Sequence, residues 1–380
     1  MPIKIMFVFG TRPEAIKMVP LIKKMQLDPN FKIVICVTAQ HRNMLDQTLQ
    51  IFNITPDYDL DIMKSSQSLS DITSKSLIGL ENIMKGEKPD LVLVHGDTST
   101  TFAAALAAFY NKIKIGHVEA GLRTFNKYQP FPEEMNRKLV ADLSDLHFAP
   151  TLSAKSNLIK EGIDENIIFI TGNTVIDCIK HTIKNNYEFK NEALGKINYA
   201  DKKVIVVTAH RRENLGKPLE NICNAILKLS ANKNLEFVYA VHSNPLVRNT
   251  VEKILSGHDN IHLIEPLDIE NMHNLISKSF LVMTDSGGIQ EEAPSFDKPV
   301  LVLRNVTERP EGVLTGALKL VGTDQNKIFD SVNELINDKK LYEKMSKAQN
   351  PFGDGKASER ICNAILFYFG RMQKPTEFIF

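Results

Sequence analysis

The segment formed by residues 284–292 has the residue types of a phosphate-binding turn. Its sequence, TDSGGIQEE, follows the apolar run 280–283, which predicts a turn from a strand into a helix. Ser286 supplies a hydroxyl, and Gly287 and Gly288 let the backbone approach a ligand closely. The unpaired N–H groups of a first helical turn attract an anion. An ordinary Ser-Gly-Gly helix start would look the same, so the neighbouring segments have to decide.

Two acids, Glu291 and Glu292, end this segment. A diphosphate bound at the turn would be repelled by carboxylates placed against it. One of these acids is better suited to accept hydrogen bonds from sugar hydroxyls. The predicted ligand is therefore a nucleotide sugar rather than a simple nucleotide.

Basic side chains follow other apolar runs in the same half of the chain. His210, Arg211 and Arg212 come directly after residues 204–208. Either guanidinium can pair a phosphate with forked geometry, and His210 adds a donor. An exposed basic loop is the alternative interpretation, and a single histidine such as His242 is more often structural. The later runs are followed by two more arginines, Arg304 and Arg309.

Three acids in the first half of the chain are candidates for proton transfer. Asp97 and Glu119 follow predicted strands, and Glu133 opens the next predicted helix. Because the carboxyl ends of parallel strands meet at one edge of a sheet, all three acids are expected at that edge. Crowded carboxylates raise one another's pKa and so supply both an acid and a base near neutral pH. No HxxE or HxH spacing accompanies them, so a metal site is not indicated.

Simpler explanations exist for two of these acids. Asp97 could cap the helix predicted over residues 98–110, and the helix macrodipole favours acids such as Glu133 and Glu134 in a first turn. Glu119 is harder to explain in this way. It lies between apolar neighbours at a strand end, where an unpaired carboxylate is costly.

Short β-branched runs alternate with helical patterns along the chain, which predicts parallel βαβ units. The strands are predicted at residues 3–9, 32–37, 91–94, 115–118, 146–149 and 167–170, and in a second series at 204–208, 237–241, 261–264, 280–283 and 300–303. The fold class is therefore α/β, with two doubly wound, Rossmann-like domains. A chain of 380 residues is about twice a typical domain, which agrees.

The domain boundary is predicted between Thr171 and Lys203, around the polar stretch 185–203. We expect an N-terminal domain over residues 1–170 that contains the three acids. A nucleotide-binding C-terminal domain follows over residues 171–356. A last helical pattern, at about residues 357–370, could pack on either domain.

Composition excludes several classes of partner. The 46 Lys and Arg residues balance 45 Asp and Glu residues, so neither a nucleic acid nor an acidic membrane is expected. Four widely spaced cysteines without a CxxC pair predict neither a disulfide framework nor a zinc site. No apolar run approaches the roughly 20 residues of a membrane span, and the run 5–9 is too short for a signal peptide. We predict a cytoplasmic protein.

Eight segments occur together in the order found in one enzyme family. They are GTRPE (10–14), TAQHR (38–42), HGDT (95–98), HVEAGLR (117–123), PEEMNR (132–137), HRREN (210–214), DSGGIQEE (285–292) and TERPE (307–311). Over residues 1 to about 370 the chain resembles the non-hydrolysing UDP-N-acetylglucosamine 2-epimerase family. The resemblance implies the glycosyltransferase-B fold with a cleft between its domains, a homodimer, and neither a metal nor a nicotinamide cofactor. It also implies that the last helix returns to the first domain.

The chemistry implied by the resemblance is anti elimination of UDP from UDP-N-acetylglucosamine to give 2-acetamidoglucal. Protonation at C2 from the other face and re-addition of UDP then give UDP-N-acetylmannosamine, a precursor for cell-surface polysaccharide. Asp97 and Glu133 match the two proton-handling acids, Glu119 a third catalytic carboxylate, and His210 the group beside the leaving diphosphate. The positions that match nucleotide-sugar-binding residues are Arg12, Lys17, Arg211, His242, Ser286, Gly287, Gly288, Glu292 and Arg309.

The resemblance also suggests regulation by substrate. Some bacterial relatives are activated by their own substrate bound beside the active site. Gln40, Arg42 and Glu134 lie in segments that could line such a site here.

The chain departs from the family pattern at three places. Ser243 stands where proline or a bulkier residue is common, and Asn305-Val306 replaces a more usual Asp-Thr. Both changes leave the exact sugar nucleotide open. The tail 371–380 has no family counterpart, and Phe378, Ile379 and Phe380 are expected to pack at a dimer surface.

Several other functions are alternatives to the non-hydrolysing epimerase. A hydrolysing epimerase would release UDP and N-acetylmannosamine with the same residues, and a relative could act on a diacetamido uronic-acid nucleotide. A glycosyltransferase shares the fold but needs no acid on both faces of C2, so Asp97 and Glu133 count against it. A nucleotide-sugar sensor without catalytic activity would need no carboxylate cluster.

Overall fold

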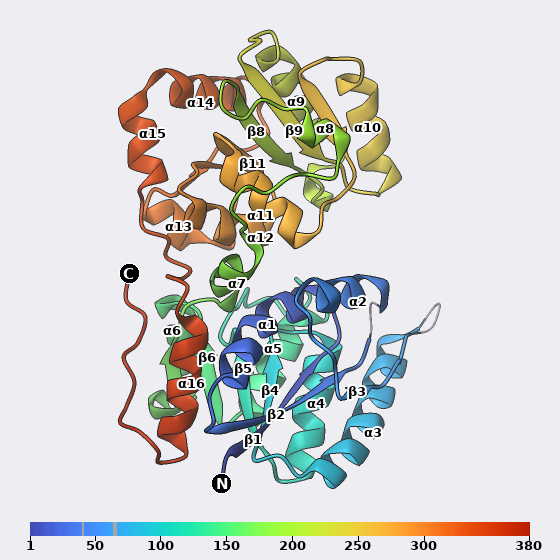
Figure 1. Ribbon diagram of the computed structural model, residues 1–380, viewed down its shortest axis with the longest axis vertical. Coiled ribbons are helices and arrows are strands. Elements are labelled where there is room, and N and C mark those ends of the chain that lie inside the picture. Colours follow the sequence, from blue (N-terminus) through green and yellow to red (C-terminus); the bar gives the residue numbers. More distant parts are fainter. Residues whose placement is uncertain (40–41, 64–66) are drawn as a thin grey trace. The chain divides into compact units, whose positions relative to one another are not determined.

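The computed structural model describes residues 1–39, 42–63 and 67–380, and it divides into two compact units (Figure 1). Unit 1 consists of Met1–His181 together with Phe352–Ile379, and unit 2 of Thr182–Pro351 together with Phe380. Each unit is built on its own parallel sheet, so the predicted fold class is confirmed.

Unit 1 contains a seven-stranded parallel sheet in the order β3-β2-β1-β4-β5-β6-β7. Its strands are β1 (Ile3–Phe9), β2 (Phe31–Val37), β3 (Tyr58–Asp59), β4 (Leu91–His95), β5 (Lys114–Val118), β6 (Leu146–Ala149) and β7 (Ile168–Ile170). Its helices are α1 (Arg12–Gln26), α2 (Arg42–Ile51), α3 (Leu69–Glu87), α4 (Ser99–Tyr110), α5 (Glu133–Leu143), α6 (Leu152–Lys160), α7 (Thr174–Thr182) and α16 (Ala357–Tyr368).

Unit 2 contains a six-stranded parallel sheet in the order β10-β9-β8-β11-β12-β13. Its strands are β8 (Lys203–Thr208), β9 (Leu235–Ala240), β10 (Ile261–Ile264), β11 (Leu281–Thr284), β12 (Val300–Val302) and β13 (Leu318–Leu320). Its helices are α8 (Glu192–Gly195), α9 (Lys217–Leu229), α10 (Pro245–Leu255), α11 (Ile269–Lys278), α12 (Gly287–Glu292), α13 (Pro310–Leu314), α14 (Gln325–Asn337) and α15 (Lys339–Ser346).

The central strands are buried along nearly their whole length and are mostly apolar, because helices cover both faces of a parallel sheet. In β4, all five residues of the sequence LVLVH are buried, and β8 is buried from its second residue to its end. This burial explains why continuous apolar runs located the strands. The sequence analysis missed β3 and β13, which are edge strands of two and three residues with the sequences YD and LKL, so neither forms a continuous apolar run.

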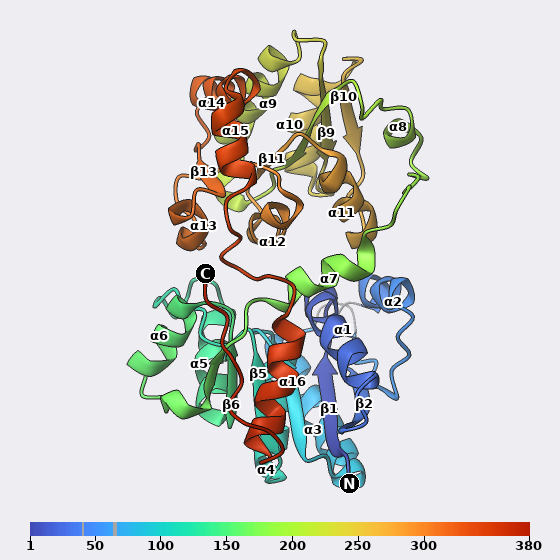
Figure 2. The same cartoon turned by 60° about the vertical axis from the view of Figure 1, so that its left-hand side comes forward.

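The division between the units differs from the predicted domain limits at α7. The Asp177 carboxylate accepts hydrogen bonds from the N–H groups of Ala357 and Ser358, at 3.0 and 2.8 Å. These bonds tie α7 to the first turn of α16, so residues 171–181 belong to unit 1. Both views show α16 alongside α1, with which it is in contact (Figure 2).

The tail after α16 folds back onto unit 1. The N–H of Phe378 donates to the Ile170 carbonyl at 2.8 Å, and the Phe378 side chain is only 3% exposed. The Arg360 guanidinium lies 5.3 Å from the centre of this ring. The expectation that Phe378 packs at a dimer surface is therefore wrong, because unit 1 itself buries this side chain.

Two further features concern the environment of the protein. All four cysteines are buried free thiols. Within the described ranges, no helix is long and apolar enough to cross a membrane.

Candidate active site

Two of the predicted acids lie at the ends of adjacent strands in unit 1. Strands β4 and β5 pair in parallel with His95 opposite Val118, and the Gly96 N–H donates to the Val118 carbonyl at 2.9 Å. Asp97 follows the end of β4 by two residues, and Glu119 follows β5 directly. Parallel pairing therefore brings both acids to one edge of the sheet, as predicted.

Asp97 is bound by α5 rather than used as a helix cap. The Arg137 guanidinium contacts the Asp97 carboxylate at 2.8 and 2.9 Å, and the Asn136 amide donates to the Asp97 carbonyl at 2.8 Å. The cap of α4 is Thr98, whose hydroxyl accepts from the Thr101 N–H. The explanation of Asp97 as the α4 cap is therefore wrong, since Thr98 has that role.

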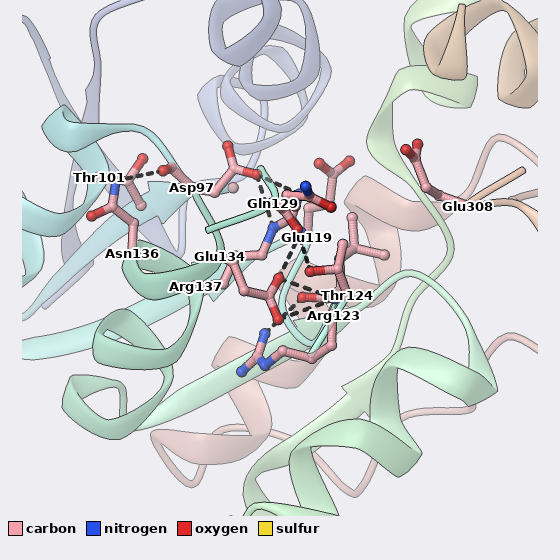
Figure 3. Close-up of polar contacts among 12 residues, drawn as sticks. Asp97, Thr101, Glu119, Arg123, Thr124, Gln129, Glu134, Asn136, Arg137 and Glu308 are labelled. Carbon is pink, nitrogen blue, oxygen red and sulfur yellow. Dashed lines mark hydrogen bonds and ion pairs between the residues drawn. The ribbon is translucent and has the colours of Figure 1, made fainter. Parts of the chain in front are cut away.

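The two acids at the start of α5 have different environments. Glu134 is buried, and it accepts hydrogen bonds from the N–H groups of Thr124 and Phe125 and from Arg137. Figure 3 shows Arg137 between the carboxylates of Asp97 and Glu134. The Glu133 Oε2 atom is buried and has no hydrogen-bond partner in the part of the chain that the structure describes. Glu134 thus holds the loop at Thr124 and Phe125 in place. The Oε2 atom of Glu133 is not engaged in such a structural contact.

Glu119 is held by two donors on the same oxygen. The Lys17 ammonium forms an ion pair with Oε2, and the Asn173 side-chain amide donates to Oε2 at 2.7 Å. Glu119 has a φ of +61°, which is uncommon outside glycine and recurs at functional sites. Lys17 was predicted to bind the nucleotide sugar, and in the structure its ammonium is engaged with Glu119.

The buried Glu14 joins the loops that follow β1 and β4. Its carboxylate accepts from the N–H groups of Gly10 and Thr11 at 3.0 and 2.8 Å, and from the hydroxyls of Thr98 and Thr101 at 2.8 and 3.0 Å. Burial raises the pKa of Glu14, and these hydrogen bonds oppose the shift. The loop that contains Asp97 is thereby fixed to the first turn of α1.

Three buried histidines lie behind the acids, in β4, β5 and β6. His117 and His147 are register partners in adjacent strands, and His95 Nε2 lies 3.8 Å from Glu119 Oε2. Burial lowers the pKa of His95 to about 4 and the pKa values of His117 and His147 to about 3. All three imidazoles are therefore neutral at physiological pH.

In unit 2, Asp285 organises the loop that follows β8. Its side chain is fully buried, and its Oδ2 accepts hydrogen bonds at 2.8 Å from the N–H groups of His210 and Arg211 and from the Asn214 amide. Asp285 Oδ1 lies 3.7 Å from His210 Nδ1. One carboxylate at the end of β11 thus sets the position of the predicted His210 and Arg211.

His210 also stacks on His242, with the ring centres 4.9 Å apart and the planes 15° from parallel. His242 Nδ1 accepts from the Asn244 N–H at 3.0 Å, so its other ring nitrogen bears the proton. Burial lowers the pKa of His210, opposed by Asp285 and reinforced by His242 and Arg211. His242 follows the next strand, β9, and the stack places its ring beside that of His210. The predicted role of His242 in binding the nucleotide sugar stays a prediction.

Two guanidinium groups converge on the start of α12, where Ser286 is the N-cap. A Cβ atom built on Gly287 would lie 3.3 Å from Arg309 and 3.6 Å from Arg211. Arg309 is oriented by a 2.6 Å hydrogen bond from its Nε to Glu291. The sequence left Arg211 and Arg212 as alternatives, and the structure places Arg211 here while Arg212 is exposed. Positive charge is therefore concentrated at the predicted phosphate-binding turn.

Glu292 lies at the other end of α12 and is held by a fully buried histidine. His273 Nε2 is 3.0 Å from Glu292 Oε2, and His273 Nδ1 is 2.6 Å from the Thr182 hydroxyl. Glu291 is engaged with Arg309, so the two acids of the segment have different partners. Glu292 is accordingly the one suited to a sugar hydroxyl.

The predicted regulatory residues have separate partners. Arg42 forms ion pairs with Asp59 and Asp46, and Glu134 contacts Arg137. Gln40 lies outside the described residues. The regulatory site stays a prediction, as does the role of Arg12 at the start of α1.

Comparisons with known proteins show the family of this chain. A family profile described as UDP-N-acetylglucosamine 2-epimerase matches residues 23–366. The chain belongs to the UDP-N-acetylglucosamine 2-epimerase family. A Bacillus subtilis UDP-N-acetylglucosamine 2-epimerase is 52% identical over 378 residues, covering 99% of this chain and 98% of the relative.

Solved structures of relatives include bound ligands. The S. aureus MnaA–UDP co-structure is 54% identical with a TM-score of 0.89, and covers 99% of this chain and 100% of that one. The Neisseria meningitidis UDP-GlcNAc 2-epimerase bound to UDP-GlcNAc is 49% identical with a TM-score of 0.86, covering 96% and 100%. The glycotransferase of kitacinnamycin, 13% identical with a TM-score of 0.64, shares the fold alone. The predicted glycosyltransferase-B class is therefore confirmed for this family member.

Sequence reasoning missed several residues that position the site of this family member. Glu14 and Asp285 lie inside segments that the sequence singled out, and both are acids buried beside strand ends. Asn173 follows β7 at the same sheet edge as the other polar clusters. The location of Glu14, Asp285 and Asn173 near strand ends could have identified them from the sequence. His273 on α11 could not be identified in this way, because its partner Glu292 lies 19 residues away.

The buried histidines predict how stability depends on pH. An unfolded histidine binds a proton near pH 6.5, so the unfolded chain binds more protons between pH 6.5 and the depressed folded pKa. Stability should therefore fall as the pH drops below about 6.5. His147→Leu should remove one such group. Lowering the pH from 7.5 to 5 should therefore reduce the free energy of unfolding of the variant by about 2 kcal/mol less than that of the wild type.

Urea unfolding at the two pH values measures this difference. His258→Gln is the control, since His258 is exposed and should leave the pH dependence unchanged. Equal relative stability of His147→Leu at both pH values would contradict a neutral, buried His147.

Proposed function

We propose that the protein interconverts UDP-N-acetylglucosamine and UDP-N-acetylmannosamine by reversible epimerisation at C2, without a cofactor. The observation that carries the proposal is the carboxylate pair at the ends of β4 and β5. Asp97 is paired with Arg137 and Glu119 with Lys17, and neither is used to cap a helix. An enzyme that only transfers a sugar needs no such cluster.

The unit 2 residues are proposed to bind UDP. Arg211 and Arg309 would pair the diphosphate at the Ser286–Gly288 turn, where the absent side chain of Gly287 lets phosphate oxygens approach. Glu292, held by His273, would accept hydrogen bonds from ribose hydroxyls. His210 and His242 would lie beside the diphosphate. Neutral His210 can donate one hydrogen bond to a leaving phosphate oxygen.

The unit 1 acids are proposed to handle the C2 proton. The bond from C1 to the phosphate oxygen breaks, and UDP leaves with the electron pair. One carboxylate of Asp97 and Glu133 takes the C2 proton, and a C1–C2 double bond forms to give 2-acetamidoglucal. A C2 proton with no adjacent carbonyl is barely acidic, so departure of UDP runs ahead and leaves positive charge on the ring. Glu119 supplies negative charge that stabilises this state.

The second half of the cycle reverses these steps on the opposite face. The other acid donates a proton to C2, and the UDP oxygen attacks C1. Atoms and charge balance, because UDP and one proton leave and return. The diphosphate-binding arginines matter as much as the acids, since they stabilise the charge that develops on UDP.

The protein is further proposed to be a cytoplasmic homodimer. Exposed apolar side chains on the neighbouring helices α3 and α4, among them Ile78, Phe109 and Tyr110, offer a surface for a second copy. Buried thiols agree with a reducing compartment. Sedimentation velocity would separate a dimer from a monomer.

One prediction from the proposed function concerns UDP affinity. Arg211→Ala should weaken UDP binding by about 1.5 to 3 kcal/mol, the usual contribution of a hydrogen bond to a charged group. Arg212→Ala removes the same charge from the exposed neighbouring position and should change the affinity by much less. Isothermal titration calorimetry with UDP measures both variants. Equal losses would remove Arg211 from the diphosphate site.

Another prediction from the proposed function concerns the C2 proton. Turnover of UDP-N-acetylglucosamine in heavy water should place deuterium at C2 of the product, because the acid that protonates C2 carries a hydrogen exchanged from solvent. Asp97→Asn should lower kcat by about 10² to 10⁴, the usual contribution of a positioned acid or base. UDP affinity should survive, since UDP binds to residues of unit 2. Asp142→Asn, at an exposed position of α5, is the control.

Proton NMR and mass spectrometry read the outcome. Epimerised sugar without solvent deuterium at C2 would overturn elimination and the roles of both acids. Release of free N-acetylmannosamine with UDP would instead identify a hydrolysing enzyme.

A further inference from the structure

Asn173 contacts Glu119 from the segment of unit 1 that joins β7 to α7. Its side-chain Nδ2 donates to Glu119 Oε2 at 2.7 Å, the same oxygen that pairs with Lys17. Asn173 is 3% exposed and lies between β7 and α7, two strands away from β5 in the sheet. The bond therefore joins distant parts of unit 1.

The backbone of Asn173 is fixed as well. Its N–H donates to the Phe352 carbonyl at 2.7 Å, and its side-chain oxygen accepts from the Val175 N–H at 3.1 Å. At the preceding Gly172, with a φ of +81°, an added Cβ would lie 3.3 Å from Gly353 Cα. The chain leaves unit 1 after His181 and returns at Phe352, so Asn173 is bonded to the returning segment and begins the outgoing one.

We propose that Asn173 is a positioning residue, which holds the Glu119 carboxylate in the orientation needed for the C2 chemistry. This role rests on the proposed function. Asn173 acts through Glu119 and does not itself need to touch the substrate. It has the properties of such a group, because its own conformation is fixed by the backbone of two chain segments.

Two donors on one oxygen restrict Glu119 in a specific way. Lys17 is a flexible ammonium that can follow the carboxylate, whereas the planar amide of Asn173 sets a direction. Glu119 also adopts an unusual backbone conformation, which the surrounding contacts have to maintain. Loss of the amide should therefore leave the charge of Glu119 in place but allow its carboxylate to adopt more than one orientation.

The matched control is Asn157, which holds the same loop by the same type of bond. Its side-chain amide donates from α6 to the Gly121 carbonyl at 3.0 Å, two residues beyond Glu119. Asn157→Leu thus removes an amide hydrogen bond to this loop without touching the carboxylate. Asn173→Leu removes the corresponding bond to the carboxylate.

The experiment compares kcat, KM and UDP affinity of the full-length variants in the epimerisation assay. Asn173→Leu should lower kcat about 10- to 100-fold, the usual loss when an orienting partner of a functional group is removed. UDP affinity should stay unchanged, and Asn157→Leu should keep kcat within about threefold of wild type. Losses that follow thermal stability equally in both variants would overturn the positioning role.

A second variant tests the contact between residue 173 and Glu119 by placing a negative charge at residue 173. Asn173→Asp places a carboxylate against Glu119, and two carboxylates at this distance do not both stay ionised near neutral pH. Lys17, His95 and His117 are titratable groups near Glu119 in the described structure. The acid side of the kcat–pH profile should therefore move to higher pH. An unshifted profile would overturn the contact with Glu119.

Activity of the wild-type protein separates this inference from the proposed function. Wild-type turnover with full activity in Asn173→Leu would overturn the positioning role alone. A wild-type protein that forms no epimer would overturn the proposed function and this role with it.

Discussion

The cost of burying a carboxylate without partners constrains both units of this protein. Glu14, Glu119 and Asp285 are each buried or nearly buried, and each accepts bonds from segments that lie far apart in the sequence. Because an unpaired carboxylate in the interior is unfavourable by several kcal/mol, these donors cannot move away independently. The loops at the strand ends are therefore held together by acids rather than by apolar packing alone.

The two units use this constraint for different electrostatic purposes. In unit 1, cations stabilise the carboxylates: Lys17 pairs with Glu119 and Arg137 with Asp97. In unit 2 the arrangement is reversed, since acids orient cations. Glu291 fixes Arg309, and Asp285 fixes the backbone of Arg211. A reaction that separates a proton from a leaving diphosphate needs both kinds of site, a proton acceptor on one and an anion receptor on the other.

Three neutral histidines lie in the strands next to the acids. His95, His117 and His147 occupy three adjacent strands, and burial keeps them deprotonated. A charged imidazole next to Glu119 would compete with Lys17 for the same carboxylate. Burial in the sheet thus keeps these imidazoles uncharged near the predicted site. For the same reason, the stability of this part of the sheet should decrease at acidic pH.

The sequence by itself determined the elements and most of the candidate residues, because strand burial and polar residues at strand ends are local patterns. All eleven predicted strands agree with observed ones to within two residues at either end, and Asp97, Glu119, Arg211 and Gly287 follow strand ends as expected. Tertiary structure alone decided the partners. It assigned the α4 cap to Thr98, gave Lys17 to Glu119, buried Phe378 in unit 1 and brought Asn173 across two strands. Those contacts join residues separated by up to 208 positions, as between Ile170 and Phe378, and no local pattern specifies such a pairing.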